Sequence, residues 1–145
     1  MRLIDYTLKL SGITDVLRRW QGVFAEVDER RRERIARYAD AIADTLARAN
    51  RAFETLERKP SDKAAQRVAI REFGRLGGYI ESIVATLEGR IDGRRLAGIK
   101  RRLEGLALEG LIAASVRQVD AARIERIAAA EGYFRALADG LRARA

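Results

Sequence analysis

The 145-residue sequence contains no cysteine and no histidine. The first absence excludes disulfide bonds and thiolate metal sites, and the second removes the side chain that most often performs general acid–base catalysis. Helical di-iron centres, which use Glu-x-x-His pairs, are excluded for the same reason. We therefore expect a protein that is not an enzyme and that needs no metal or other cofactor.

Proline is also scarce, and long apolar runs are absent. Pro60 is the only proline, and alanine and arginine, both strong helix formers, dominate the composition. No run of about 18 apolar residues occurs, so the sequence predicts no membrane-spanning helix. Charged residues such as Asp5, Lys9 and Asp15 interrupt any signal-peptide core. We expect a soluble, cytoplasmic, single-domain protein.

An apolar seam at alternating steps of three and four residues begins at the N-terminus. Its members are Leu3, Tyr6, Leu10, Ile13, Leu17, Trp20, Phe24 and Val27. This spacing keeps one stripe of a slightly underwound helix against a partner helix, and it predicts coiled-coil-like packing. The pattern resumes, displaced by four residues, at Ile35, Tyr38, Ile42, Thr45, Ala49, Ala52 and Leu56. Such a stutter unwinds a supercoil locally without ending the helix.

Helix-capping and helix-breaking residues divide the chain into helices. Ser11 can cap a helix that begins near residue 12, and Pro60 ends that helix before Ser61 caps the next. Gly89 is suited to a left-handed C-terminal cap, and Gly110 predicts a further break. The predicted elements are an N-terminal arm or short helix over 1–10 and helices over 12–59, 62–88, 92–109 and 111–143. The fold class is all-α, a bundle of about four long helices.

Two carboxylate pairs each lie on one helix face: Glu29 with Glu33, and Asp40 with Asp44. Such pairs could hold Mg²⁺, which needs only oxygen ligands. However, Arg37 and Arg48 follow Glu33 and Asp44 at the spacing that favours ion pairs within a helix. We interpret both pairs as ordinary solvated ion pairs.

The net charge of +8 favours anionic partners in general. The densest basic segment contains Arg90, Arg94, Arg95, Lys100, Arg101 and Arg102. A second cluster, half neutralised by neighbouring acids, contains Arg30, Arg31, Arg32, Arg34 and Arg37. No aromatic side chain lies within either cluster to stack on a base. The alternative function that these clusters support is non-specific, salt-sensitive binding to a nucleic-acid backbone.

Three glycines fall within the helix predicted over 62–88. Gly74 and Gly78 form a G-x-x-x-G pattern, with Gly77 beside them. The pattern predicts a close crossing against a neighbouring helix or a point of local weakness.

The first functional hypothesis is a non-enzymatic assembly or adaptor protein that self-associates or docks to a partner protein, with no small-molecule substrate. The interface residues that it predicts are Leu3, Leu10, Leu17, Trp20, Phe24 and Val27. Trp20 is the only tryptophan, and aromatic anchors often dominate interface energetics. Residues 1–10 are expected to pack on the bundle or on another copy of the chain. A weaker alternative is a membrane-perturbing effector domain in which these apolar residues insert at an anionic membrane interface.

Overall fold

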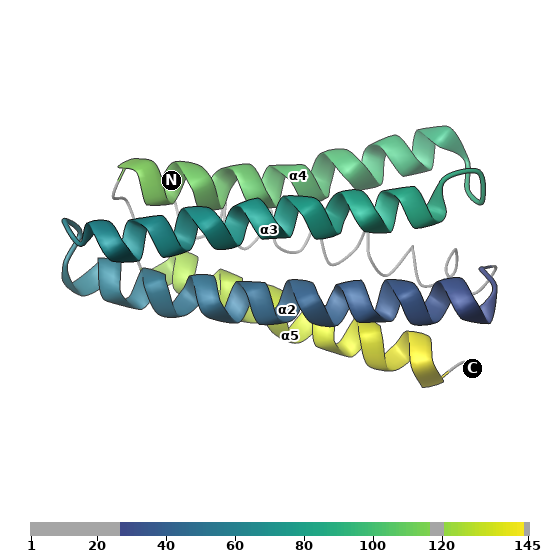
Figure 1. The fold of residues 1–145 in the computed structure, drawn as a ribbon, viewed down its shortest axis with the longest axis horizontal. Helices are drawn as coiled ribbons and strands as arrows, with labels where there is room; N and C mark the ends of the chain where they lie inside the picture. The colour runs from purple at the N-terminus through teal and green to yellow at the C-terminus, as the bar shows by residue number, and fades with distance from the viewer. Residues whose placement is uncertain (1–26, 117–120, 144–145) are drawn as a thin grey trace.

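The computed structural model describes residues 27–116 and 121–143, and within these ranges the chain forms four α-helices and no strand (Figure 1). The helices are α2 (Glu29–Arg58), α3 (Lys63–Leu87), α4 (Gly93–Val116) and α5 (Ala121–Ala143). The prediction of an all-α bundle is confirmed.

The four helices pack in the spatial order α4, α3, α2, α5. Among the described residues, the extensive helix–helix contacts are those of α2 with α5, α2 with α3, and α3 with α4. Short turns connect α2 to α3 and α3 to α4, so these neighbours are antiparallel (Figure 1). The start of α2, the end of α3 and the start of α4 therefore lie at the same end of the bundle.

The core lies along the stripes that the sequence pattern predicts. On α2, Ile35, Ile42, Thr45, Ala49, Ala52 and Leu56 are buried, and on α3, Ala65, Ala69, Phe73, Leu76, Ile80, Ile83 and Leu87 are buried. Tyr38 is half-buried, and its ring centroid lies 6.5 Å from that of Tyr79 on α3. The rings of Phe53 and Phe73 stack across the same interface, with centroids 5.6 Å apart. The periodicity therefore identifies the buried faces of α2 and α3 correctly.

The outer helices add their own apolar stripes to this core. On α5, Ile127, Phe134, Leu137 and Leu141 are buried, as predicted, while Ile124 is half-buried. On α4, Ile99 is buried and Leu96 is half-buried. Of the predicted stripes, Leu103, Leu106, Ile112, Val116 and Val119 have side chains outside the described part of the molecule.

A helix start at Glu29 differs from the prediction of one uninterrupted helix over 12–59. Asp28 has an extended backbone (φ −63°, ψ 159°) and is the N-cap of α2. Its carbonyl accepts a hydrogen bond from the Arg32 amide at 2.9 Å, and its carboxylate binds Arg31 at 3.0 Å. The stutter is thus the start of a helix, because aspartate favours the N-cap position and acids are stabilised in the first turn.

Of the two capping residues predicted for α3, the one at its C-terminal end is confirmed and the one at its N-terminal end is not. The N-cap of α3 is Asp62, whose carboxylate accepts a hydrogen bond from the Ala65 amide at 3.0 Å, so the prediction of Ser61 is wrong by one residue. Aspartate and serine cap equally well, and the sequence alone does not choose between adjacent candidates. Gly89 has φ +77°, which confirms the predicted left-handed C-terminal cap.

Helix α4 continues past the predicted break at Gly110 and ends at Val116. A single glycine in a helix costs only about 1 kcal/mol relative to alanine, and the flanking leucine, alanine and glutamate residues favour helix. The predicted boundary between 92–109 and 111–143 is therefore wrong, and α5 begins at Ala121.

Among the described residues, no helix crosses α3 closely at its glycines. Apart from the adjacent residues and the backbone of the same helix turn, no described heavy atom lies within 4 Å of the position that a Cβ would take at Gly74, Gly77 or Gly78. Gly74 and Gly78 are also solvent-exposed. The predicted close contact is therefore wrong for the described residues, and local weakness of α3 stays a prediction.

Candidate functional site

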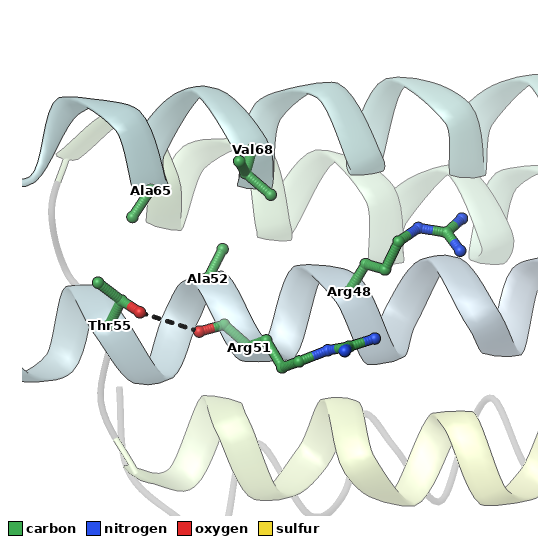
Figure 2. Close-up of a pocket in the computed structure, with 6 residues that line it drawn as sticks. All are labelled: Arg48, Arg51, Ala52, Thr55, Ala65 and Val68. Atoms are coloured by element: carbon green, nitrogen blue, oxygen red, sulfur yellow. Dashed lines mark hydrogen bonds between the residues drawn. The ribbon is translucent and has the colours of Figure 1, made fainter.

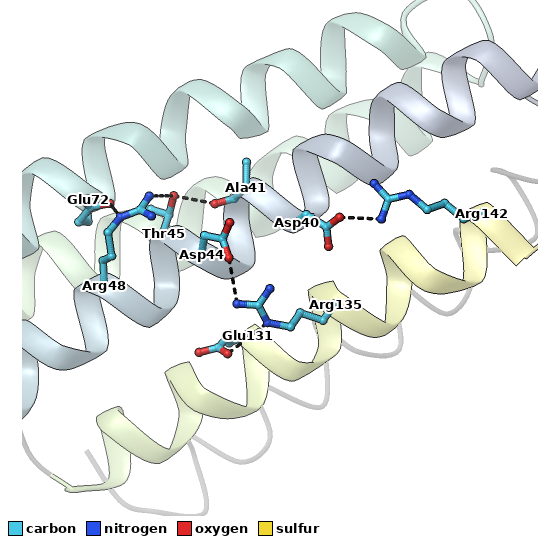
Figure 3. Close-up of polar contacts among 9 residues, drawn as sticks. All are labelled: Asp40, Ala41, Asp44, Thr45, Arg48, Glu72, Glu131, Arg135 and Arg142. Carbon is cyan, nitrogen blue, oxygen red and sulfur yellow. Dashed lines mark hydrogen bonds and ion pairs between the residues drawn. The ribbon is translucent and has the colours of Figure 1, made fainter.

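Arginines of α5 bind three carboxylates of α2, and Figure 3 shows the contacts with Asp40 and Asp44. Arg142 Nη1 lies 2.6 Å from Asp40 Oδ2, and Arg142 Nε lies 3.3 Å from Glu33 Oε2. Hydrogen bonding to Asp40, and then to Glu33, raises the pKa of Arg142 although partial burial opposes the shift. One guanidinium therefore holds two carboxylates of α2.

A second arginine repeats this arrangement two turns away. Arg135 Nη2 lies 3.0 Å from Asp44 Oδ1, and Arg135 Nε lies 3.3 Å from Glu131 Oε2 on its own helix. Hydrogen bonding to Asp44 raises the pKa of Arg135. Three of the four acids considered for Mg²⁺ (Glu33, Asp40 and Asp44) are thus occupied by arginines that tie α5 to α2.

These partners differ from the predicted pairs within α2. Glu33 and Asp44 bind α5 arginines rather than Arg37 and Arg48, which follow them by four residues. The favourable four-residue spacing identifies charged helix faces. It gives no information about partners that lie 91 and 109 residues away in sequence.

Sequence reasoning missed a buried ion pair between α2 and α3. The Glu72 side chain is only 7% exposed, and its Oε2 accepts a hydrogen bond from Arg48 Nε at 3.0 Å (Figure 3). Arg75 Nη1 lies 3.7 Å from Glu72 Oε1. Arg48 also donates to Thr45 Oγ1 at 3.3 Å, and this hydroxyl donates to the Ala41 carbonyl at 2.7 Å. The only available signal was the position of Glu72 on the apolar face, beside Phe73.

An open groove lies between α2 and α3 near the turn that joins them. Its volume is about 350 Å³, and it is lined by Arg48, Arg51, Ala52, Thr55, Ala65 and Val68 (Figure 2). The alanines and the valine supply apolar walls, while the arginine side chains extend along the groove away from the turn. Arg48 is engaged by Glu72, so Arg51 is the arginine of the groove without an ion pair among the described residues.

The part of the chain that the structure describes holds no group of three or more acidic, histidine or cysteine residues arranged to bind a metal ion. Within the same ranges, no helix combines the length and apolar character needed to cross a membrane.

Most of the predicted protein interface lies outside the described residues. Leu3, Leu10, Leu17, Trp20 and Phe24 belong to this undescribed part, as does the predicted arm over 1–10. Val27, the last residue of the N-terminal seam, is 4% exposed and belongs to the core cluster. Of the predicted interface residues, Val27 alone is described, and it is part of the core.

The residues of the alternative nucleic-acid surface lie in the α3–α4 turn and along α4. Arg90, Arg94, Arg95, Lys100 and Arg101 are exposed, and Arg102 lies in α4. Lys100 Nζ lies 3.9 Å from Glu104 Oε1, which partly neutralises its charge. The Asp92 carboxylate accepts a hydrogen bond from the Arg94 amide at 3.0 Å at the start of α4.

The fold brings the two arginine clusters of the sequence to one end of the bundle. The cluster at residues 30–37 starts α2, and Arg90, Arg94 and Arg95 surround the turn where α3 passes into α4 (Figure 1). The pKa of Asp28 is lowered, mainly by its hydrogen bond from Arg31, with a further contribution from the charge of Arg90. The effect of Arg90 is the smallest of these contributions, and it indicates that the α3–α4 turn lies near the N-cap of α2.

Comparison with protein-family models, with curated proteins and with solved structures gives no match to this chain.

Proposed function

We propose that this chain is a non-enzymatic helical-bundle protein that acts by assembly, through packing of its N-terminal seam against a second copy of itself. The residues that carry the contact are Leu3, Leu10, Leu17, Trp20 and Phe24. Val27 anchors the seam to the core rather than facing a partner, because it is almost fully buried.

One observation carries this proposal: the same three-and-four spacing, where it continues through 35–56, forms a helix-packing surface along the whole of α2. Six of its seven members are buried and Tyr38 is half-buried. An apolar stripe of this kind is stable only when it is covered. The seam over 3–24 has the same spacing with larger side chains, and we infer that it requires a covering helix as well.

The described helices show how apolar stripes of this kind are covered in this chain, namely by a neighbouring helix. The stripes of α2 and α3 cover one another, and α5 and α4 pack on their outer sides. We infer that the N-terminal seam, which lies outside the described residues, is covered in the same way by a helix of a second copy.

Trp20 offers a direct test, because it is the only tryptophan and it lies in the seam. In the assembled protein we expect blue-shifted emission that moves to longer wavelength on dilution, as chains separate and the indole enters water. Far-UV circular dichroism of the same samples checks that the bundle stays folded. Blue-shifted emission that is independent of concentration, from a particle with the mass of one chain, would overturn self-association.

A further inference from the structure

The end of the bundle shared by α2, α3 and α4 carries exposed arginines from α2, from the α3–α4 turn and from α4. Arg30 and Arg34 precede Tyr38 by two turns and one turn, so all three lie on one stripe of α2. The contact between Tyr38 and Tyr79 places this stripe beside α3. Followed toward the end of the bundle, the stripe leads to Arg90 in the turn and then to Arg94 and Arg95 at the start of α4.

These five arginines are available to a ligand. Arg30, Arg34, Arg90, Arg94 and Arg95 are all exposed, and none makes an ion pair with a described residue. Several acids at this end are already occupied: Asp28 binds Arg31, and Glu33 and Asp40 bind Arg142. These ion pairs neutralise three acids at this end, and Glu29, Glu88 and Asp92 remain beside the arginines, so the net positive charge of this end is moderate.

We propose that this surface, defined as the arginine end (Arg30, Arg34, Arg90, Arg94 and Arg95), binds the phosphate backbone of a nucleic acid. Planar guanidinium groups bind phosphate oxygens with two parallel hydrogen bonds, which suits arginine rather than lysine to this task. The proposal concerns a second surface and does not depend on the N-terminal seam.

The chemistry of the arginine end favours a nucleic acid over a membrane. Ile70 and Leu108 are the exposed large hydrophobic side chains among the described residues. Each lies at least 15 residues along its helix from this end, or roughly 22 Å at the rise of an α-helix. A surface without apolar side chains cannot insert into a bilayer. Because residues 28–37 and 88–95 contain no aromatic, binding follows the backbone without base preference.

The test measures binding of the full chain to a fluorescent DNA duplex of mixed sequence by anisotropy, over a series of NaCl concentrations. The variants Arg30→Gln/Arg34→Gln and Arg90→Gln/Arg94→Gln each remove two charges from the arginine end. Arg67→Gln/Arg71→Gln is the matched control, since these arginines are exposed on α3 and have the same four-residue spacing. Circular dichroism checks the fold of every variant.

We expect each variant of the arginine end to weaken binding about tenfold and to reduce the slope of log Kd against log salt by about 2, one unit for each lost phosphate contact. The control should change Kd less than about twofold, because its arginines lie outside the proposed contact. Equal weakening by all three variants would reduce the effect to net charge and overturn the site. Absence of DNA binding, with binding instead to phosphatidylglycerol vesicles, would overturn the nucleic-acid assignment.

Discussion

At the scale of single residues, the partners of Glu72 decide whether its burial is tolerable. Removing a carboxylate from water is costly unless hydrogen bonds and opposite charge replace the lost hydration. Arg48 supplies a hydrogen bond at 3.0 Å, whereas Arg75 lies at 3.7 Å and is half exposed. Arg48 is therefore the principal partner, and it also orients the Thr45 hydroxyl.

Replacement of Arg48 by alanine should lower the free energy of unfolding by about 1–2 kcal/mol, because the buried Glu72 carboxylate loses its closest partner. The expected value lies below that of a fully buried pair, since the Arg48 side chain is 36% exposed. Arg51→Ala is the matched control and should change stability by less than about 0.5 kcal/mol. Urea denaturation measures both variants, and equal losses would contradict the assigned role of Glu72.

Burial at this scale is predictable from the sequence, while ionic partners are not. The apolar periodicity identifies Phe73, Leu76 and their neighbours as core, because burial depends on the helix face alone. The choice of Arg142 as partner for Asp40 depends on how α5 crosses α2. That geometry arises from packing between segments about 100 residues apart, which no local pattern records.

At the scale of helices, the local sequence predicts that a helix exists better than it predicts where the helix begins and ends. Pro60 and Gly89 mark their turns correctly, since each restricts or permits backbone angles in a way that few other residues do. The break at Asp28 was hidden by favourable charge spacing that is equally compatible with a continuing helix and with a new helix start. The predicted helix break at Gly110 does not occur, because the residues around this glycine favour helix.

The glycines of α3 provide a test at this scale. Gly74→Ala, Gly77→Ala and Gly78→Ala should each stabilise the protein by about 0.5–1 kcal/mol, because alanine favours helix and each site has open space for a Cβ. Gly89→Ala should instead destabilise by roughly 1–2 kcal/mol, because its φ of +77° strains a residue with a Cβ. Thermal unfolding followed by circular dichroism compares the four variants, and destabilisation at Gly74 or Gly78 would show that α3 uses these glycines for a contact.

At the scale of the whole molecule, the sequence predicts an all-α bundle but not the order of its helices. Alternating apolar stripes require helices to pack together, and they leave open which pairs meet. The convergence of the two arginine clusters, which are some 60 residues apart in sequence, follows only from the antiparallel order of α2, α3 and α4. The arginine end is therefore not predictable from the sequence, although all five of its arginines belong to the two basic clusters.

The central claim is that the N-terminal seam drives assembly. It is tested most directly by light scattering on the full chain during size-exclusion chromatography. The seam variant is Leu17→Glu/Phe24→Glu, and Ile70→Glu/Leu108→Glu is the matched control at exposed residues of α3 and α4. We predict that the wild type and the control are multimers, and that the seam variant approaches the mass of one chain with its helical circular dichroism retained. A folded seam variant with the mass of the wild type would contradict the account.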